Sequence, residues 1–286
     1  MLHFLFDPFA FAFMRRALVG CVALSLAGPP LGVILVLRRM SLMSDVLQHG
    51  ILPGLALGAM FGGLSFWAMG LGGLIAGLCV ALLAGLAARA TSGREDSQLA
   101  GAYLIALALG VALVSHQQGI DLAELLFGSV LGVTNVALQL IVGVASLSLL
   151  GLAVIWRPLV LDSFDPVFLR SIGGHGGLWH MAFLGLVVLC VVAGYSALGT
   201  LMSVGLMMLP AIAARHFAVS LSGQVRAAMA IALLASLLGL LVSYYADMAS
   251  GPAIILTAGG VWLLGVLAGP QQSVRARLVR KSHLTG

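Results

Sequence analysis

Asp45 and His49 are the residues whose types and spacing best fit chemistry in this apolar chain. Four positions apart in a helix, a carboxylate and an imidazole project from one face. A charged group in hydrocarbon costs about 2.5 to 3.5 kcal/mol on insertion scales, so such groups face a bundle interior or an aqueous path. The pair therefore predicts a site on an ion pathway. The alternative is a structural hydrogen-bonded pair that holds two helices together.

A row of glycines follows the pair and shapes the same segment. It recurs at every fourth position, as Gly50, Gly54, Gly58 and Gly62. One helix face is then nearly bare backbone, which lets a neighbouring helix approach closely. Pro53 removes one backbone donor, so a carbonyl near His49 is left free for a ligand or a water molecule.

The composition predicts an all-α polytopic membrane protein with a single transmembrane domain over residues 1–286. Hydrophobic residues make up 61% of the chain and charged residues only 8%, with a mean hydropathy of +1.14. Soluble domains carry about 25% charged residues. Uncharged runs predict eight or nine spans: 17–37, 46–69, 71–88, 99–115, one from about 133, two separated near Gly199 within 181–214, 227–246, and one within 248–274. A polar loop is expected at 89–98 and a surface helix around 126–129.

The distribution of basic residues predicts the orientation. With nine spans, twelve of the 14 basic residues fall on one side and only Arg15 and Arg16 on the other. Basic residues concentrate on the cytoplasmic side of membrane proteins. The polar segment at about 157–177 and the basic tail at 275–286 are therefore expected in the cytoplasm. The net charge of +5 reflects this orientation and not nucleic-acid binding.

The residues present exclude a chain that hydrolyses ATP by itself. A P-loop needs a lysine after its glycine-rich turn, and the single lysine of the sequence, Lys281, lies in the tail. The sequence also has no H-E-x-x-H motif, and one acid–histidine helix supplies too few ligands for a metalloprotease. The chain is therefore not expected to be an enzyme, and another subunit must supply the energy for transport.

Several stretches match, in order, the motifs of one family. Residues 38–54 resemble the signature of the metal-ion family of bacterial ABC transporter permeases, which import zinc, manganese or iron. Ser163-Phe164-Asp165-Pro166 with Gly173 is similar to the cytoplasmic coupling segment of that family. The other matching stretches are 126–133, Leu209-Pro210-Ala211 with Arg215, Asp247 with Ser250-Gly251-Pro252, and Gly269-Pro270.

The chain departs from the family pattern at a few positions. Ser44 and Gln48 stand where the family usually has glycine before the acid and serine before the histidine. The coupling segment has Val167, Phe168 and Leu169 where the family usually has an acid and small residues. Because the acid–histidine pair itself is retained, the departures bear on metal preference and on partner fit.

The resemblance implies a permease that works as a homodimer in the bacterial inner membrane. Its partners would be a separate cytoplasmic ATPase, an extracytoplasmic metal-binding protein and the lipid bilayer. The cargo would be a divalent metal ion that contacts Asp45 and His49, with no permanently bound cofactor. Asp247 would be either a carboxylate that admits the ion or a helix cap. The ATPase-coupling residues would be Ser163, Phe164, Asp165, Pro166, Phe168 and Gly173.

Residues 163–173 are expected to form a short helix along the cytoplasmic face. Pro166 suits a first helical turn, and Asp165 or Ser163 would cap the open amides. The apolar side chains of this helix would fill a groove on the ATPase: Val167, Phe168 and Ile172.

Two other transport classes remain as alternatives. A permease for a chelated metal, such as a siderophore or cobalamin, calls for a wide cavity lined by aromatic residues, which make up 7% of this chain. A stand-alone secondary transporter is opposed by the coupling segment and by the lack of an inverted repeat of residues 45–54.

Overall fold

The computed structural model describes residues 7–41, 43–63, 65–91, 95–115, 134–171, 173–174, 176–271 and 273–275. Within these ranges the regular elements are helices. They are η1 (Asp7–Ala10), α2 (Ala12–Leu37), α3 (Met43–Gly50), α4 (Leu52–Gly62), α5 (Phe66–Thr91), α6 (Glu95–Ser115), α8 (Asn135–Phe164), α9 (Pro166–Ser171), α10 (Gly176–Leu198), α11 (Thr200–Ala214), α12 (Leu221–Ala246) and α13 (Ser250–Ala268). The motif at 126–133, the surface helix expected at 126–129, Ile172 and residues 276–286 lie outside the described part of the chain.

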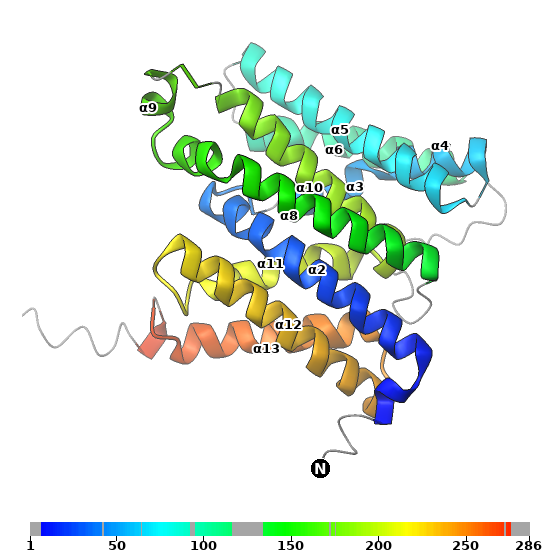
Figure 1. Cartoon of the computed structure of the whole chain (residues 1–286). Coiled ribbons are helices and arrows are strands. Elements are labelled where there is room, and N and C mark those ends of the chain that lie inside the picture. Colours follow the sequence, from blue (N-terminus) through cyan, green and yellow to red (C-terminus); the bar gives the residue numbers. More distant parts are fainter. Residues whose placement is uncertain are drawn as a thin grey trace, which may run out of the picture.

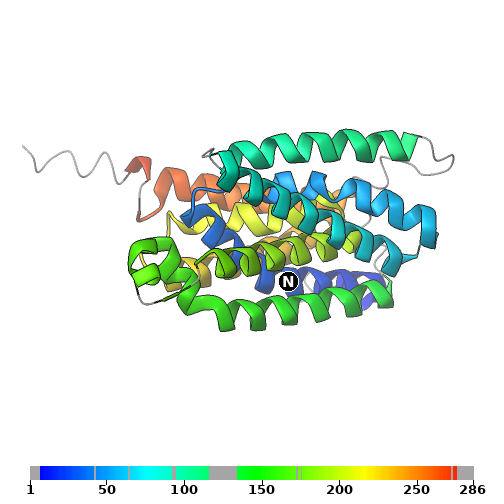
Figure 2. The ribbon, with the colours of Figure 1, turned by 90° about the horizontal axis from the view of Figure 1, so that it is seen from above.

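The long helices pack side by side in one bundle, with α2 near its centre (Figure 1). Helix α2 packs against α8, α11 and α12, and α10 packs against α8, α5 and α11. Glycines let α2 approach α11 closely, since Gly28 and Gly32 both lie against Met207. Seen from above, α6 lies along one edge of the bundle and α8 along the opposite edge (Figure 2).

Five described helices are long and apolar enough to cross a membrane by length and composition: α2, α8, α10, α12 and α13. Shorter apolar helices cover Trp67–Leu83, Ala100–Leu113 and Leu201–Ala214. The structure therefore confirms an all-helical, multi-pass membrane protein, while the number of eight or nine spans stays a prediction. The expected separation near Gly199 is confirmed, because Gly199 has a φ of 88° and precedes α11.

Three expected boundaries are wrong. The span expected at 46–69 is instead two helices that meet at Ile51, and it ends where Gly63 takes a φ of 63°. The break has a local cause, because Pro53 lies in the first turn of α4, where its missing N–H is tolerated. The loop expected at 89–98 is shorter, since α5 continues to Thr91 and α6 begins at Glu95. Residues 157–164, expected as part of a polar segment, are the last turns of α8.

The glycine row of α3 and α4 lies against α5. A β-carbon at Gly54 would overlap the carbonyl group of Gly72, and one at Gly58 would overlap that of Ala68. A β-carbon at Gly72 would in turn overlap the carbonyl group of Gly54. The two backbones are therefore in direct contact, and α5 holds the broken span in place.

Gly54→Ala is expected to lower the thermal stability of the purified permease. Overpacking a tight contact costs about 1–3 kcal/mol, which exceeds the gain of up to about 1 kcal/mol from replacing a helical glycine by alanine. Gly70→Ala is the matched control, because a β-carbon there would meet no atom within 4 Å. In detergent, Gly54→Ala should unfold at a lower temperature than the wild type. Gly70→Ala should unfold at the same temperature as the wild type or at a higher one. Equal stability of the two variants would contradict the close contact.

Candidate functional site

Asp45 and His49 share one open face of α3. The Asp45 Oδ1 atom lies 3.8 Å from His49 Nε2, which is too long for a hydrogen bond. The Asp45 side chain is 61% exposed and that of His49 30%. The imidazole lies beside Tyr103 of α6, with 6.3 Å between the ring centroids. In the described part of the chain no third His, Cys, Asp or Glu completes a metal-binding cluster with them. One chain thus offers two neighbouring ligands on an accessible surface.

Ser44 and Gln48 occupy the neighbouring, buried side of α3, about 100° around the helix from Asp45 and His49. Their side-chain oxygens, Ser44 Oγ and Gln48 Oε1, have no hydrogen-bond partner among the described residues. These two departures from the family pattern therefore affect how the buried side of α3 packs against its neighbours. They do not add a ligand to the open face that carries the acid and the imidazole.

A helix-capping turn between α2 and α3 directs the chain back into the bundle. Arg39 adopts a left-handed conformation with φ of 61°. Its amide donates to the carbonyl of Val36 at 3.2 Å, and the amide of Met40 donates to that of Leu35 at 2.8 Å. This is the hydrogen-bond pattern of a Schellman motif, in which buried Met40 provides the accompanying apolar contact. The turn places the start of α3 at the end of α2.

Arg38 ties this turn to α8 and α10. Its Nη2 atom donates to Asp162 Oδ2 at 2.8 Å, and its Nε atom donates to Ser163 Oγ at 2.9 Å. Its Nη1 atom lies 2.7 Å from His180 Nδ1, which must accept because a guanidinium has no acceptor. The motif at 38–54 begins with Arg38 but does not predict its partners Asp162 and His180, because these lie more than 120 positions further along the chain. The cluster joins the turn before α3 to the end of α8, which leads directly into α9.

A short capped helix, α9, is present in the expected coupling segment, but it is shorter than the helix expected over 163–173, because Ser163 and Phe164 belong to α8. The Phe168 amide donates to Asp165 Oδ1 at 2.8 Å, so Asp165 is the cap. Ser163 does not cap the helix, because its hydroxyl donates to the Leu159 carbonyl within α8. Leu169 is buried against the bundle, whereas Phe168 is 49% exposed. Phe164 and Val167 are exposed as well.

A glycine turn ends this segment. Gly173 has a φ of 77°, a conformation that glycine adopts without strain. The amide of Gly174 donates to the Leu169 carbonyl at 2.9 Å. The turn returns the chain to the start of α10, so α9 stands in the connection between α8 and α10 at one end of the bundle (Figure 1).

Asp247 terminates α12 in a left-handed conformation, with φ of 50° and ψ of 42°. Aspartate is one of the few residue types enriched in this region. The Met248 amide donates to the Ser243 carbonyl at 3.2 Å, and Ser243 Oγ donates to the Met248 carbonyl at 2.7 Å. This geometry gives Asp247 the role of a helix terminator, while a role in admitting the ion stays a prediction.

These features define a class of protein: a multi-pass membrane transport protein. Its apolar helices form the membrane domain, one interrupted span carries an accessible acid–imidazole pair, and a capped helix exposes apolar side chains at one end.

Comparison with known proteins identifies the family. The sequence matches the ABC 3 transport family over residues 10–269. It is 31% identical over 263 residues to the manganese import system permease protein ScaB of Streptococcus parasanguinis, covering 92% of each chain. It is 29% identical over 254 residues to the chelated iron transport system membrane protein YfeD of Yersinia pestis, covering 87% of this chain and 83% of that one. The chain therefore belongs to the ABC 3 transport family.

A solved structure agrees with this assignment. PsaBC from Streptococcus pneumoniae in complex with Fab matches with a TM-score of 0.82 and 28% sequence identity, covering 98% of this chain and all of the matched chain. The protein is thus a permease subunit of an ABC transporter and not an enzyme, and ATP hydrolysis belongs to a separate subunit. Family membership also removes the stand-alone secondary transporter as an alternative.

Proposed function

We propose that this chain is the permease of an ABC importer that carries a divalent transition-metal ion, manganese foremost, across a bacterial inner membrane. The observation that carries the proposal is the Asp45–His49 pair on the open face of α3. The named function of the similar protein ScaB, manganese import, supports the choice of ion. Histidine with carboxylate suits zinc and also tolerates manganese or iron(II), so the choice of manganese depends on the similar proteins.

A second copy of the chain would complete the ion site. A zinc-like ion prefers about four ligands, and one α3 helix supplies two. Two-fold symmetry brings the same surface of each subunit together, so it would contribute a second carboxylate and a second imidazole. Two carboxylates would balance the double charge of an ion that has lost its water. The accessibility of both side chains in the single chain supports this arrangement.

Metal-stimulated ATP hydrolysis tests the proposed cargo. The permease, its ATPase and its metal-binding protein would be reconstituted in proteoliposomes and assayed with Mn²⁺, Zn²⁺ and Fe²⁺ in turn. We expect stimulation by free divalent ions, with Mn²⁺ the most effective. Stimulation by an iron–siderophore complex and by none of the free ions would favour the chelate permease instead.

Exposed position Ser171 tests the orientation of α9. In a Cys79→Ala background, which removes the one exposed native thiol among Cys21, Cys79 and Cys190, Ser171→Cys should resist a membrane-impermeant reagent added to intact cells. Ser65→Cys, in the turn between α4 and α5, is the control and should react. Position 171 is a better probe than Ser163, which is half-buried and bonded to Arg38, whereas Ser171 is exposed. Ready labelling at position 171 would reverse the predicted topology.

A further inference from the structure

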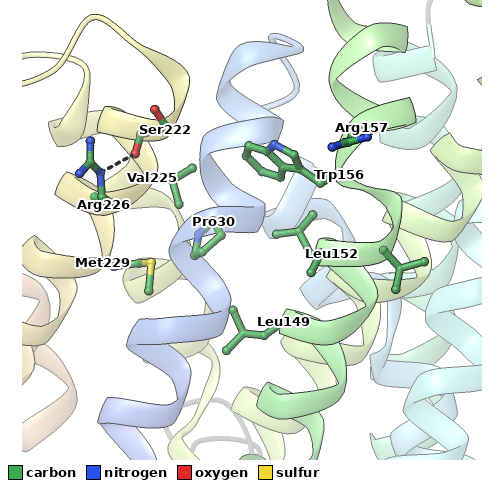
Figure 3. Close-up of a pocket in the computed structure, with 11 residues that line it drawn as sticks. Pro30, Leu149, Leu152, Trp156, Arg157, Ser222, Val225, Arg226 and Met229 are labelled. Carbon is green, nitrogen blue, oxygen red and sulfur yellow. Dashed lines mark hydrogen bonds between the residues drawn. The ribbon is translucent and has the colours of Figure 1, made fainter.

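A pocket of about 580 Å³ opens between α2, α8 and α12, and neither Asp45 nor His49 lines it. Helices α8 and α12 both pack against α2, so α2 forms the floor of the groove between them, with Pro30 at its surface (Figure 3). Leu149 and Leu152 line one wall, and Val225 and Met229 line the other. Most of the groove is therefore hydrocarbon.

One end of this pocket is basic. Arg157 stands on the α8 wall beside Trp156, and Arg226 stands on the α12 wall (Figure 3). Arg226 Nε donates to the carbonyl of Ser222 at 3.4 Å. Within the described ranges neither guanidinium is paired with a carboxylate. Two guanidinium groups thus flank one mouth of an apolar groove with their charge uncompensated.

The basic end of the pocket lies near the end of the bundle that the predicted topology places in the cytoplasm. Arg157 precedes the end of α8 by seven residues, and Arg226 follows the start of α12 by five, which places them about 10 Å and about 8 Å from these helix ends. At the same end of the bundle lie α9, the connection from α11 to α12 and the end of α13 (Figure 1). Basic residues and a tryptophan at this depth are typical of a membrane–water interface on the cytoplasmic side.

The groove lies on the side of the bundle away from α6. Helices α6 and α8 form opposite edges (Figure 2), and α3 packs against α6, α10, α5 and α11. If a second copy faces the Asp45–His49 pair, the α8 side is the perimeter that meets lipid. The outer face of α8 fits this, since Leu150 and Val154 are both strongly exposed.

We propose that this pocket binds an anionic phospholipid of the cytoplasmic leaflet. Arg157 and Arg226 would attract the anionic headgroup from opposite walls of the mouth, and either guanidinium can match phosphate oxygens with two parallel hydrogen bonds. The acyl chains would lie in the groove along Leu152 and Leu149, on the floor made by α2. The lipid fills a space that no side chain fills and neutralises two charges beside the segment that leads into α9.

The test compares lipid binding to the delipidated permease–ATPase complex. Dioleoylphosphatidylglycerol and dioleoylphosphatidylcholine would be titrated separately, with bound lipid counted by native mass spectrometry. The wild-type complex should prefer phosphatidylglycerol. The double variant Arg157→Gln with Arg226→Gln should bind phosphatidylglycerol roughly 25-fold more weakly than the wild-type complex. Each basic residue near an anionic membrane surface contributes about fivefold in affinity. Arg215→Gln, an exposed cation outside the pocket, should leave the preference unchanged.

A second variant separates the groove from the charges. Val225→Trp keeps both arginines but fills the groove, and it should reduce binding of phosphatidylglycerol while the ATPase still co-purifies. Equal binding of the two lipids by the wild-type complex would overturn the proposal, as would unchanged preference in the double arginine variant. Loss of the ATPase from that variant with its lipid preference intact would assign the arginines to the subunit contact instead.

Discussion

Asp45→Asn should reduce metal uptake to background while the permease stays folded and assembled with its ATPase. Asparagine keeps the size and helix position of aspartate but removes the charge that the proposed ion site needs. The Asp45 side chain makes no hydrogen bond to His49 and is largely exposed, so its loss should not disturb the packing of α3. His49→Ala is expected to have nearly the same effect, because the site then loses an imidazole from each subunit. Uptake of ⁵⁴Mn by cells that express each variant measures both.

Two controls separate a lost ligand from a damaged protein. Asp247→Asn also removes an exposed acid, but asparagine tolerates the left-handed conformation that ends α12, so uptake should remain close to wild type. If Asp247→Asn by itself abolished metal uptake, that residue would instead have a role in admitting the ion. Co-purification with the ATPase reports the assembly of each variant. Full uptake by Asp45→Asn would leave the pair a purely structural role.

Phe168→Ala should uncouple the permease from its ATPase. Phe168 lies on a helix held by a capping aspartate and by buried Leu169, so the exposed ring is presented in a fixed position. Buried aromatic anchors dominate interface energies, and loss of one costs on the order of 2 kcal/mol, or about 30-fold in affinity. Binding of purified ATPase to the permease in nanodiscs measures that loss, and transport should fall with it.

An exposed aromatic residue at the other end of the bundle, Phe61, provides the matched control. Phe61, near the end of α4, is 88% exposed, and the predicted topology places it toward the outer end of the second span. Phe61→Ala removes the same side chain from a surface that the ATPase does not reach. It should bind the ATPase as wild type does. If Phe168→Ala does so too and still transports, α9 is not the coupling helix.

The sequence by itself determined the features that depend on neighbouring residues. An acid and an imidazole four positions apart share a face in any α-helix, and Asp165 followed by Pro166 is a helix start in most contexts. The glycine row predicted a close helix approach for the same local reason, because glycine lacks the β-carbon that would hold a neighbour away. Hydropathy alone separated the membrane domain from any soluble class.

Only the tertiary structure decided which distant groups meet. Arg38 reaches Asp162 and His180, which lie 124 and 142 positions further along the chain. Arg157 and Arg226 line opposite walls of one pocket because α8 and α12 pack on the same central helix. Helices that are apolar on every side carry no periodic pattern to say which face packs on which neighbour. The partners of their few polar side chains therefore depend on how the helices pack. Helix caps, tight turns and the residues that share a helix face depend only on residues nearby in the sequence.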